Sequence, residues 1–243
     1  MKFVAVIPSR YASVRFPAKP LAKILNKEML AWVIEGAKSA EVFTDIIVAT
    51  DHAEIASLAK AYKATAVMTD PDLPTGTDRV WQAVKNIDCD WVVNIQGDEP
   101  LIAARALQDL VNKCEANPDW SMASLATQLR VEELENPNVV KVIMNQNDQA
   151  IYFSRFAIPF SRDKEFNSEV AKKHMGIYAY KKSFLQKFCA QEPTVLEKKE
   201  SLEQLRALYM GVAIGMQVGE YDTCGVDVPE DITIVESILK ERT

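Results

Sequence analysis

The sequence predicts the α/β fold class, with a mainly parallel sheet and helices on both of its faces. Three observations lead to this prediction. Short apolar runs of strand length alternate with amphipathic stretches of helix length through the first half of the chain. Short polar turns join them, and such alternation places helices on both sides of a parallel sheet. The composition, 48% hydrophobic and 26% charged in 243 residues, is that of a soluble globular protein with a sizeable core.

The first half of the chain predicts strands and helices in regular alternation. In order, these are strand 3–7, helix 28–40, strand 45–50, a helix entered through 51–54, strand 66–68, helix 77–87, strand 91–96 and helix 103–115. The run 45–50 is mostly apolar, which is typical of a strand buried on both faces. Asp51 stands where it could cap the helix that follows. This succession predicts a Rossmann-like arrangement, in which ligands bind beyond the carboxyl ends of the strands.

The second half is more mixed and predicts a β-rich segment inserted into this α/β frame. Its predicted elements are strands 122–129, 139–144, 176–180 and 212–218 and helices 202–210 and 229–241. The polar stretch 160–173 is interpreted as a loop or flap. No internal repeat, low-complexity tract or linker interrupts the chain, so residues 1–243 are expected to form a single domain.

Composition argues against several classes of function. No apolar run approaches the roughly 18 residues of a membrane span, and the N-terminus enters a strand without the features of a signal peptide. Four cysteines are scattered without C-x-x-C spacing, which indicates reduced thiols in a cytoplasmic protein rather than zinc ligands or disulfides. The net charge of −6 argues against a nucleic-acid-binding surface.

The first strand runs into a loop with three cations and two prolines but no glycine. Arg10, Arg15 and Lys19 follow the carboxyl end of this strand, and the first 27 residues contain no acid. The loop matches neither G-x-x-x-x-G-K-[ST] nor G-x-G-x-x-G. We therefore expect a polyanion, such as a nucleoside triphosphate, to be held here by charge and side-chain donors. The alternative is a solvated basic face, but the prolines and Tyr11 favour an ordered loop.

Two carboxylates stand beside glycine turns in distant segments of the chain. Asp98 follows Gly97 at the end of a buried strand, and Asp227 follows Gly225 shortly before a predicted helix. Two such carboxylates could share one or two divalent ions, and Asp98 together with triphosphate oxygens suits Mg²⁺. The alternative for each carboxylate is a helix cap, and Glu99 could equally be the cap in its segment.

Other candidate residues give weaker signals. The turn over 73–79 feeds a helix, and its backbone groups and Arg79 could contact the edge of a base, although such a junction is common. His174 follows a polar stretch that contains Arg162, and a lone histidine is more often structural than functional. No Ser–His–Asp or Cys–His pairing is indicated, which argues against covalent catalysis.

Six motifs in a fixed order give the chain a resemblance to a known family. They are I-P-S-R-Y-A-S-V-R-F-P-A-K-P-L, N-I-Q-G-D-E-P-L-I, Y-F-S-R-F-A-I-P-F-S-R-D, H-M-G-I-Y-A-Y, L-E-Q-L-R-A-L and G-V-D-V-P-E-D. They resemble the motifs of the 3-deoxy-manno-octulosonate cytidylyltransferases (CMP-Kdo synthetases) across essentially the whole chain. The resemblance implies a single nucleotidyltransferase domain with a nucleotide-diphospho-sugar transferase-like fold. It also implies an enzyme that activates an eight-carbon 2-keto sugar acid as its CMP conjugate for lipopolysaccharide assembly.

The resemblance assigns roles to residues at matching positions. Nucleotide contacts are implied for Arg10, Arg15, Lys19, Thr75, Gly76 and Arg79. Sugar-acid contacts are implied for Gln96, Arg162, His174, Tyr178, Glu203 and Gln204. Catalytic roles are implied for Lys19 and for the Mg²⁺ ligands Asp98 and Asp227. The planar guanidinium of Arg162 suits a bidentate contact to the carboxylate of the sugar.

The expected reaction is a direct in-line transfer, in which the anomeric 2-hydroxyl of the sugar attacks the α-phosphorus of CTP and pyrophosphate leaves. Four positions depart from the commonest pattern of the family: Ala18 replaces a glycine, Thr75 replaces a serine, and Lys198 and Lys199 replace a His-Ile-like pair. Some members of the family prefer an 8-amino analogue of the sugar, so both acceptors stay open.

Two further interpretations remain beside this one. The first is a cytidylyltransferase for another acid or alcohol, such as a sialic acid or a polyol phosphate. The second is a non-catalytic CTP-binding regulator, against which the presence of both Asp98 and Asp227 argues. The resemblance also implies a homodimer whose interface lies in the irregular middle segment, and we expect no nucleic-acid or membrane partner.

Overall fold

The chain folds into two compact units, which are described one at a time. The computed structural model describes residues 1–12, 16–162, 169–221 and 224–241. Unit 1 comprises Met1–Val111 and Asp222–Thr243, and unit 2 comprises Asn112–Tyr221. The sequence of unit 2 is therefore an insertion into the sequence of unit 1, and its five strands bear out the predicted β-rich insertion.

Unit 1 is built on parallel strands in the order β6-β1-β4-β5. Their bounds are β1 Phe3–Ser9, β4 Asp45–Thr50, β5 Thr65–Met68 and β6 Trp91–Asn94. In the central strand, Val6 pairs with Ile47 on one side and with Asn94 on the other. The residues of β1 are buried without the alternation of a half-exposed strand, because helices cover both faces of these strands.

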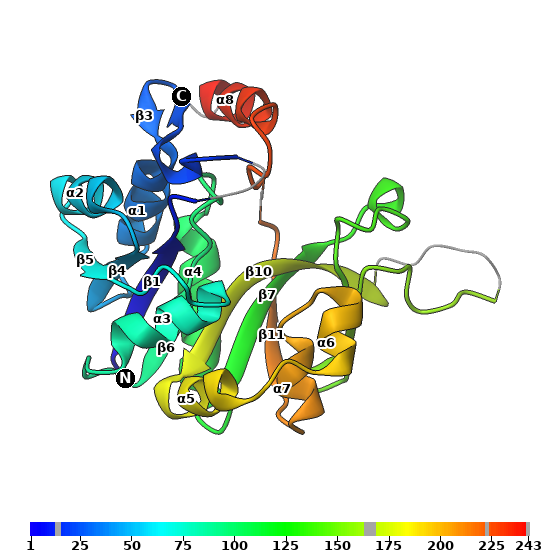
Figure 1. Cartoon of the computed structure of the whole chain (residues 1–243). Coiled ribbons are helices and arrows are strands. Elements are labelled where there is room, and N and C mark those ends of the chain that lie inside the picture. Colours follow the sequence, from blue (N-terminus) through cyan, green and yellow to red (C-terminus); the bar gives the residue numbers. More distant parts are fainter. Residues whose placement is uncertain (13–15, 163–168, 222–223, 242–243) are drawn as a thin grey trace. The chain divides into compact units, whose positions relative to one another are not determined.

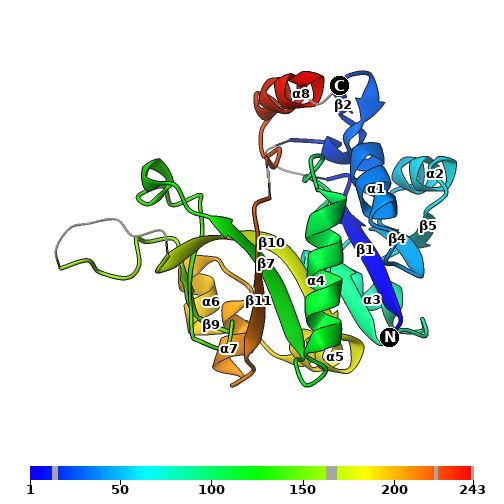
Figure 2. The same ribbon diagram turned by 180° about the vertical axis from the view of Figure 1, so that it is seen from behind.

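The helices of unit 1 lie on both faces of its strands, as predicted. Their bounds are α1 Met29–Ser39, α2 Ala53–Ala61, α3 Gly76–Val84 and α4 Ala104–Ala116, the last of which leads into unit 2. Figures 1 and 2 show α1 and α4 on one face and α3 on the other. The side-chain amide of Gln108 donates to the carbonyl oxygen of Ala40 at 3.0 Å, which ties α4 to the end of α1.

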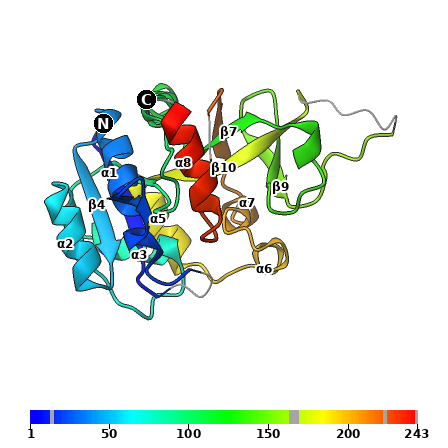
Figure 3. The same cartoon turned by 90° about the horizontal axis from the view of Figure 1, so that it is seen from above.

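The C-terminal segment packs against the beginning of the chain and completes unit 1. Here a short 3₁₀ helix, η1 (Lys19–Leu21), precedes the two-stranded hairpin of β2 (Lys23–Ile24) and β3 (Lys27–Glu28), and α8 (Asp231–Glu241) lies beside them (Figure 3). The Leu25 N–H donates to Glu236 Oε1 at 2.9 Å. A buried apolar cluster joins the two ends of the sequence through Ile24, Met29, Leu101, Val226 and Val235. Burial of this surface favours the packed arrangement through the hydrophobic effect.

Unit 2 is built on strands of mixed direction. Their bounds are β7 Met122–Gln128, β8 Lys141–Met144, β9 Ala150–Ser154, β10 Ala171–Lys181 and β11 Ile214–Val218. The long strand β10 pairs antiparallel with both β7 and β8, whereas β11 runs parallel to β7 and β9 pairs with β8. The register between β10 and β7 shifts between Met175 and Tyr178, which marks a bulge.

Short helices pack against the strands of unit 2. They are the 3₁₀ helix η2 (Val131–Glu133) and the α-helices α5 (Lys182–Ala190), α6 (Val195–Glu200) and α7 (Leu205–Tyr209). Aromatic rings join α5 to β10, since the ring centroids of Tyr180 and Phe188 lie 5.7 Å apart. Among the helices that the structure describes, none combines the length and the apolar character needed to cross a bilayer.

Several predicted elements need correction. The helix α2 begins at Ala53 with His52 as its N-cap residue and no side-chain cap, so Asp51 is not the predicted cap. The stretch 160–173, predicted as a loop, contains the start of β10 at Ala171. The sequence prediction missed β2, β3, β9, α5 and α6, and its helix 28–40 began one residue early, at Glu28 of β3.

Candidate active site

A cavity of about 270 Å³ lies at the carboxyl ends of the strands of unit 1. Three segments that are distant in sequence line it: the loop after β1, the first turn of α3 and the turn after β6. The predicted nucleotide contacts that line it are Arg10, Lys19, Gly76 and Arg79. This position is where ligands bind in open α/β sheets.

The cationic loop after β1 is closed by backbone contacts. The N–H of Ala18 donates to the carbonyl oxygen of Tyr11 at 3.0 Å. Ala18 has a φ of 54°, in the left-handed region, which costs a residue with a Cβ about 1–2 kcal/mol. Arg10 is exposed at the rim of the cavity, and Arg15 lies outside the described residues. The strain at Ala18 explains why glycine is the easier residue at this place in the loop.

Lys19 joins the cationic loop to the predicted metal ligands. Its ammonium nitrogen lies 2.5 Å from Asp98 Oδ2 and donates to the carbonyl oxygen of Val226 at 2.9 Å. The Val226 N–H in turn donates to the carbonyl oxygen of Asp98 at 2.9 Å. These contacts bring the backbone segments of Asp98 and Asp227 together, although well over 100 residues separate them in the sequence.

The structure decides against the helix-cap alternative at both carboxylates. The helix α4 begins at Ala104, well beyond Asp98, whose carboxylate faces Lys19 instead. The helix α8 begins at Asp231, and the carboxylate of that residue accepts the N–H groups of Asp227 and Val228. Asp227 itself is exposed. Both predicted metal ligands therefore lie in turns that precede a helix rather than at its cap.

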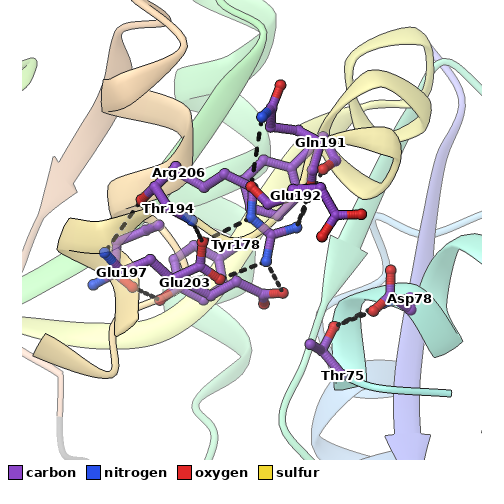
Figure 4. Close-up of polar contacts among 11 residues, drawn as sticks. Thr75, Asp78, Tyr178, Gln191, Glu192, Thr194, Glu197, Glu203 and Arg206 are labelled. Carbon is purple, nitrogen blue, oxygen red and sulfur yellow. Dashed lines mark hydrogen bonds and ion pairs between the residues drawn. The ribbon is translucent and has the colours of Figure 1, made fainter. Parts of the chain in front are cut away.

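The predicted nucleotide contacts Thr75 and Gly76, at the start of α3, have different surroundings. Thr75 is the N-cap of α3, and its hydroxyl accepts the N–H of Asp78 and donates to Asp78 Oδ2 (Figure 4). Gly76 lines the cavity, and a Cβ on it would lie 3.7 Å from the ring of Pro8. The Thr75 hydroxyl is used to cap α3, whereas the backbone of Gly76 borders the cavity.

Arg79 is buried beneath the site and bound by other side chains. Its guanidinium is fully shielded from solvent, hydrogen-bonds the Thr69 hydroxyl and lies 3.4 Å from Asp51 Oδ2. Burial lowers the pKa of the Arg79 guanidinium, and Arg10 adds to this effect while Asp51 opposes it. Because its Nε has no protein partner among the described residues, Arg79 keeps a donor for a ligand.

Asp51 is a functional candidate that the sequence reasoning missed. Its Oδ1 accepts the N–H of Tyr11 at 3.1 Å, and its Oδ2 faces Arg79. The same carboxylate thus holds the cationic loop and the guanidinium of α3. The signal was present in the sequence, because Asp51 follows a buried strand at its carboxyl end, as Asp98 does.

The predicted sugar-acid contacts fall into two groups. Gln96 lies in unit 1, where it lines the cavity beside Asp98, and its amide is 3.4 Å from Asn94 Oδ1. The others lie in unit 2. Of these, Arg162 is exposed at the end of a described stretch. The remaining four form a cluster of His174, Tyr178, Glu203 and Gln204.

The centre of this cluster is the hydroxyl of Tyr178, which donates to Gln204 Oε1 at 3.0 Å. Gln204 is 2% exposed, and its Nε2 has no partner among the described residues. Burial, with a contribution from the Glu203 carboxylate, raises the pKa of the Tyr178 hydroxyl well above its usual value. The cluster therefore presents neutral hydrogen-bonding groups beside one carboxylate.

His174 is buried on β10 against the neighbouring strand β7. Its Nε2 lies 3.0 Å from the hydroxyl of Ser124, and its ring centroid is 4.9 Å from that of Phe153. The ring of Tyr178 also lies close to it, with centroids 5.4 Å apart. Burial lowers the pKa of His174 to about 3, so its imidazole is neutral at physiological pH.

Arg206 organises the segment that carries Glu203 and Gln204 (Figure 4). Its guanidinium, 3% exposed, forms a bidentate pair with Glu197 at 2.9 and 2.5 Å and lies 3.3 Å from Glu203. Such fork-shaped pairs fix geometry as well as charge. Neither Arg206 nor Glu197 was singled out from the sequence, although the spacing of Glu203 and Arg206 places them on one face of a helix turn.

The donor set in unit 1 fits Mg²⁺ bound together with a nucleotide. Among the residues placed by the structure, no group of three His, Cys, Asp or Glu side chains could hold a metal by itself. Mg²⁺ characteristically takes one or two carboxylates and completes its shell with water and substrate phosphates. Asp98 and Asp227 supply such carboxylates beside cations that suit phosphate.

Comparison with known proteins agrees with this geometry. Residues 4–214 match the family described as Cytidylyltransferase. A 3-deoxy-manno-octulosonate cytidylyltransferase of Bdellovibrio bacteriovorus is 44% identical, over 100% of this chain and 99% of that protein. An 8-amino-3,8-dideoxy-manno-octulosonate cytidylyltransferase of Shewanella halifaxensis is 42% identical, over 98% of this chain and 99% of that protein.

Solved structures extend the comparison to the fold. A CMP:2-keto-3-deoxy-manno-octonic acid synthetase complexed with CTP matches with a TM-score of 0.95 and 35% identity, over 100% of both chains. A 4-diphosphocytidyl-2C-methyl-D-erythritol synthase from Anaerococcus prevotii matches with a TM-score of 0.67 at 15% identity, over 98% of this chain and 99% of that one. The second likeness concerns the fold alone.

Proposed function

Since the chain belongs to the cytidylyltransferase family, we propose that it transfers CMP from CTP to the anomeric 2-hydroxyl of 3-deoxy-manno-octulosonate or of its 8-amino-8-deoxy analogue, releasing pyrophosphate. The observation that carries the proposal is the contact of Lys19 with Asp98 at the cavity of unit 1. A cation for phosphate and a carboxylate for a metal meet there, which is the pair of charges that nucleotidyl transfer requires.

The nucleotide half of the proposal concerns the residues around this cavity. Arg10 and Lys19, with Arg15 from the same loop, bind the triphosphate and stabilise the charge that develops on the leaving pyrophosphate. The backbone at Gly76 and the side chain of Arg79 contact the nucleoside. Because these groups are held by the strands and by α3, much of the catalytic effect comes from positioning.

The metal in this proposal is Mg²⁺, with Asp98 and Asp227 as its protein ligands. When bound there, Mg²⁺ supplies positive charge that lowers the pKa of the attacking hydroxyl and neutralises phosphate oxygens. The ammonium group of Lys19 balances the charge of Asp98. Lys19 therefore has two proposed partners, the Asp98 carboxylate and the pyrophosphate.

The acceptor half of the proposal assigns the sugar acid to Gln96, Arg162 and the cluster of unit 2. The free amide nitrogen of Gln204 and the neutral His174 suit the hydroxyl groups of a sugar. The guanidinium of Arg162 suits its carboxylate. Lys198 and Lys199, which depart from the usual residues of the family, are both exposed on α6.

The assembly in this proposal is a homodimer formed through unit 2. Large apolar side chains are exposed there, among them Phe156 at 80% and Phe160 at 88%. Exposed apolar residues in one stretch are typical of a surface that is covered by a partner. We place the reaction in the cytoplasm, where CTP is available.

A direct test measures pyrophosphate release from CTP and Mg²⁺ with the two sugar acids side by side, and with a sialic acid as a third acceptor. We expect release with at least one of the octulosonates and none with the sialic acid. Pyrophosphate release with only the sialic acid would show that the enzyme acts on another class of acceptor. CTP binding without release from any acceptor would indicate a regulator instead.

A further inference from the structure

We propose that the hydroxyl of Ser9 donates a hydrogen bond to an oxygen atom of the bound nucleotide. This inference rests on the proposed function, because it adds a contact to the proposed CTP site. Ser9 is the last residue of β1 and lines the cavity together with Arg10 and Lys19. The sequence reasoning assigned no role to it.

The first argument is that the Ser9 hydroxyl is buried without a partner. Ser9 is 2% exposed, and its Oγ makes no hydrogen bond to any residue that the structure describes. A buried hydroxyl without a partner lowers stability, so native proteins rarely keep one that has no other use. Ser154, which is 3% exposed, shows the ordinary case, since its Oγ donates to Glu200 Oε1 at 2.7 Å.

The second argument is that Gly97, the close neighbour of this hydroxyl, carries no side chain that could pair with it. A Cβ at position 97 would lie 3.1 Å from Ser9 Oγ and 3.2 Å from the carbonyl oxygen of Pro8. Contacts that short would crowd both atoms, so a side chain at position 97 would require Ser9 or the Pro8 backbone to shift. The hydroxyl therefore lies close to the backbone of Gly97, in the wall of the cavity.

The third argument concerns the chemistry of its neighbours. Arg10 and Lys19 carry only donors, so neither can accept the proton of the Ser9 hydroxyl. A nucleotide drawn in by these cations brings oxygen atoms of its phosphates and ribose, all of which are acceptors. Gln96 and Asp98 also line the cavity and carry acceptors, but neither bonds the Ser9 hydroxyl, so an oxygen atom of the ligand can take its proton.

The test is Ser9→Ala, assayed as pyrophosphate release with the octulosonate saturating. Loss of one neutral hydrogen bond predicts a KM for CTP that rises about three- to tenfold. The midpoint of thermal unfolding without ligand should stay the same or rise, because no protein contact is lost. A KM for CTP equal to that of the wild type would overturn the inference.

Ser154→Ala is the matched control, since it removes a hydroxyl of similar burial that has a partner. We expect a lower midpoint of unfolding and an unchanged KM for CTP, the reverse of the Ser9→Ala pattern. A loss of CTP affinity in both variants, in proportion to lost stability, would count against a ligand contact at Ser9.

A second nucleotide, 2′-deoxy-CTP, identifies the oxygen that accepts the bond. If the acceptor is the ribose 2′-hydroxyl, wild type and Ser9→Ala will have the same KM for 2′-deoxy-CTP. If it is a phosphate oxygen, the variant will raise the KM for both nucleotides alike. Wild-type protein that releases no pyrophosphate from either nucleotide would instead overturn the proposed function and leave Ser9 to be judged by direct binding of CTP.

Discussion

Lys19 and Asp98 show how single residues set the charge of the site. The Asp98 side chain is about one-third exposed and the Lys19 side chain is largely buried. The attraction between their charges is therefore screened less by solvent and salt than it would be in a surface pair. The ammonium group also donates to the Val226 carbonyl oxygen, which fixes the backbone next to Asp227. One side chain therefore contacts Asp98 and the residue that precedes Asp227.

Asp98→Asn should lower turnover by at least about 100-fold, which is the usual cost of removing one major electrostatic contact from a transition state. The amide is a poorer ligand for Mg²⁺ and leaves Lys19 without its counter-charge. Steady-state pyrophosphate release at saturating CTP and Mg²⁺ measures this effect. Asp109→Asn is the control, because Asp109 pairs with Arg105 on α4, away from the cavity.

The control variant should turn over at close to the wild-type rate. Near-normal, Mg²⁺-dependent turnover in Asp98→Asn would contradict the assignment of Asp98 as a metal ligand. A loss of similar size in both variants would point to a general effect of removing acidic charge.

At the scale of the element, the pairing of β10 with β7 buries an ionisable side chain. His174 of β10 lies opposite Ala126 of β7, and its imidazole contacts the Ser124 hydroxyl. Burial favours the neutral imidazole because the charged form would lose its hydration. Protonation of that ring therefore disfavours the packing of these two strands.

This burial predicts that acid destabilises the protein through His174. The folded state has a pKa of about 3 at this residue, whereas the unfolded chain takes up a proton near pH 6.5. Stability is therefore complete above about pH 6.5 and is lost as the pH falls, by about 2 kcal/mol between pH 7 and pH 5. Urea unfolding at pH 7, 6 and 5, with wild type and His174→Asn compared, measures this difference.

The variant should be less stable at pH 7 and should lose less stability on acidification than the wild type. Carboxylates contribute equally to both proteins, so they cancel in the comparison. Parallel pH dependences for the two proteins would show that His174 is not the titrating group.

Elements with a strong local pattern could be predicted from the sequence. The predicted strand 45–50 has the bounds of β4, because a short apolar run rich in β-branched residues between polar turns is typical of a buried strand. The start of β10 could not be predicted, because Lys172 and Lys173 make it polar. In the fold, Lys172 donates to Gln128 and Lys173 pairs with Glu133, and neither partner is near in sequence.

The sequence contains a signal for helix α6, although the sequence prediction missed this helix. Thr194 accepts the N–H of Glu197, and Glu197 accepts the N–H of Thr194, which is a capping box. The sequence Thr-Val-Leu-Glu shows this spacing, but charged residues obscure the apolar period that follows. Arg206, which buries the Glu197 carboxylate, could be linked to it only through the fold.

At the scale of the whole molecule, the exposed apolar surface belongs largely to unit 2. Ile151 on β9 is 55% exposed, and Phe156 and Phe160 follow it in the chain. Burial of such residues in an interface is worth about 25 cal/mol per Å² of apolar surface. The proposed homodimer would cover them.

Ile151→Glu should weaken this dimer, because a charge would be buried in an apolar contact. Sedimentation equilibrium at micromolar concentration should give twice the mass of one chain for the wild type and a lower average mass for the variant. Ile234→Glu on α8 is the matched control, since Ile234 is 54% exposed in unit 1. A wild type with the mass of one chain would contradict the dimer, and equal masses for both variants would place its interface elsewhere.

The charged residues of the site could be predicted from the sequence, whereas the residues that position them could not. Their residue type and their position after predicted strands mark Arg10, Lys19 and Asp98 in the sequence. In the structure, all three line one cavity. Asp51 contacts Tyr11 and Arg79, which only the folded chain brings near, and the proposal for Ser9 rests on the burial of its hydroxyl without a partner among the described residues. A sequence shows which groups carry charge, whereas it does not show which buried groups lack a partner.

The insertion of unit 2 also sets the order in which the two units can be completed during synthesis. Unit 2 is one continuous stretch, so all of it is synthesised before residues 224–241. The apolar cluster around Ile24 and Met29 is completed by Val226 and Val235. Until these two valines are synthesised, they cannot cover the apolar side chains of Ile24 and Met29. The Lys19 contact to Val226 likewise forms only after the last part of the chain emerges. Nascent chains stalled before Val226 would therefore contain every strand of unit 1 and still lack a finished site.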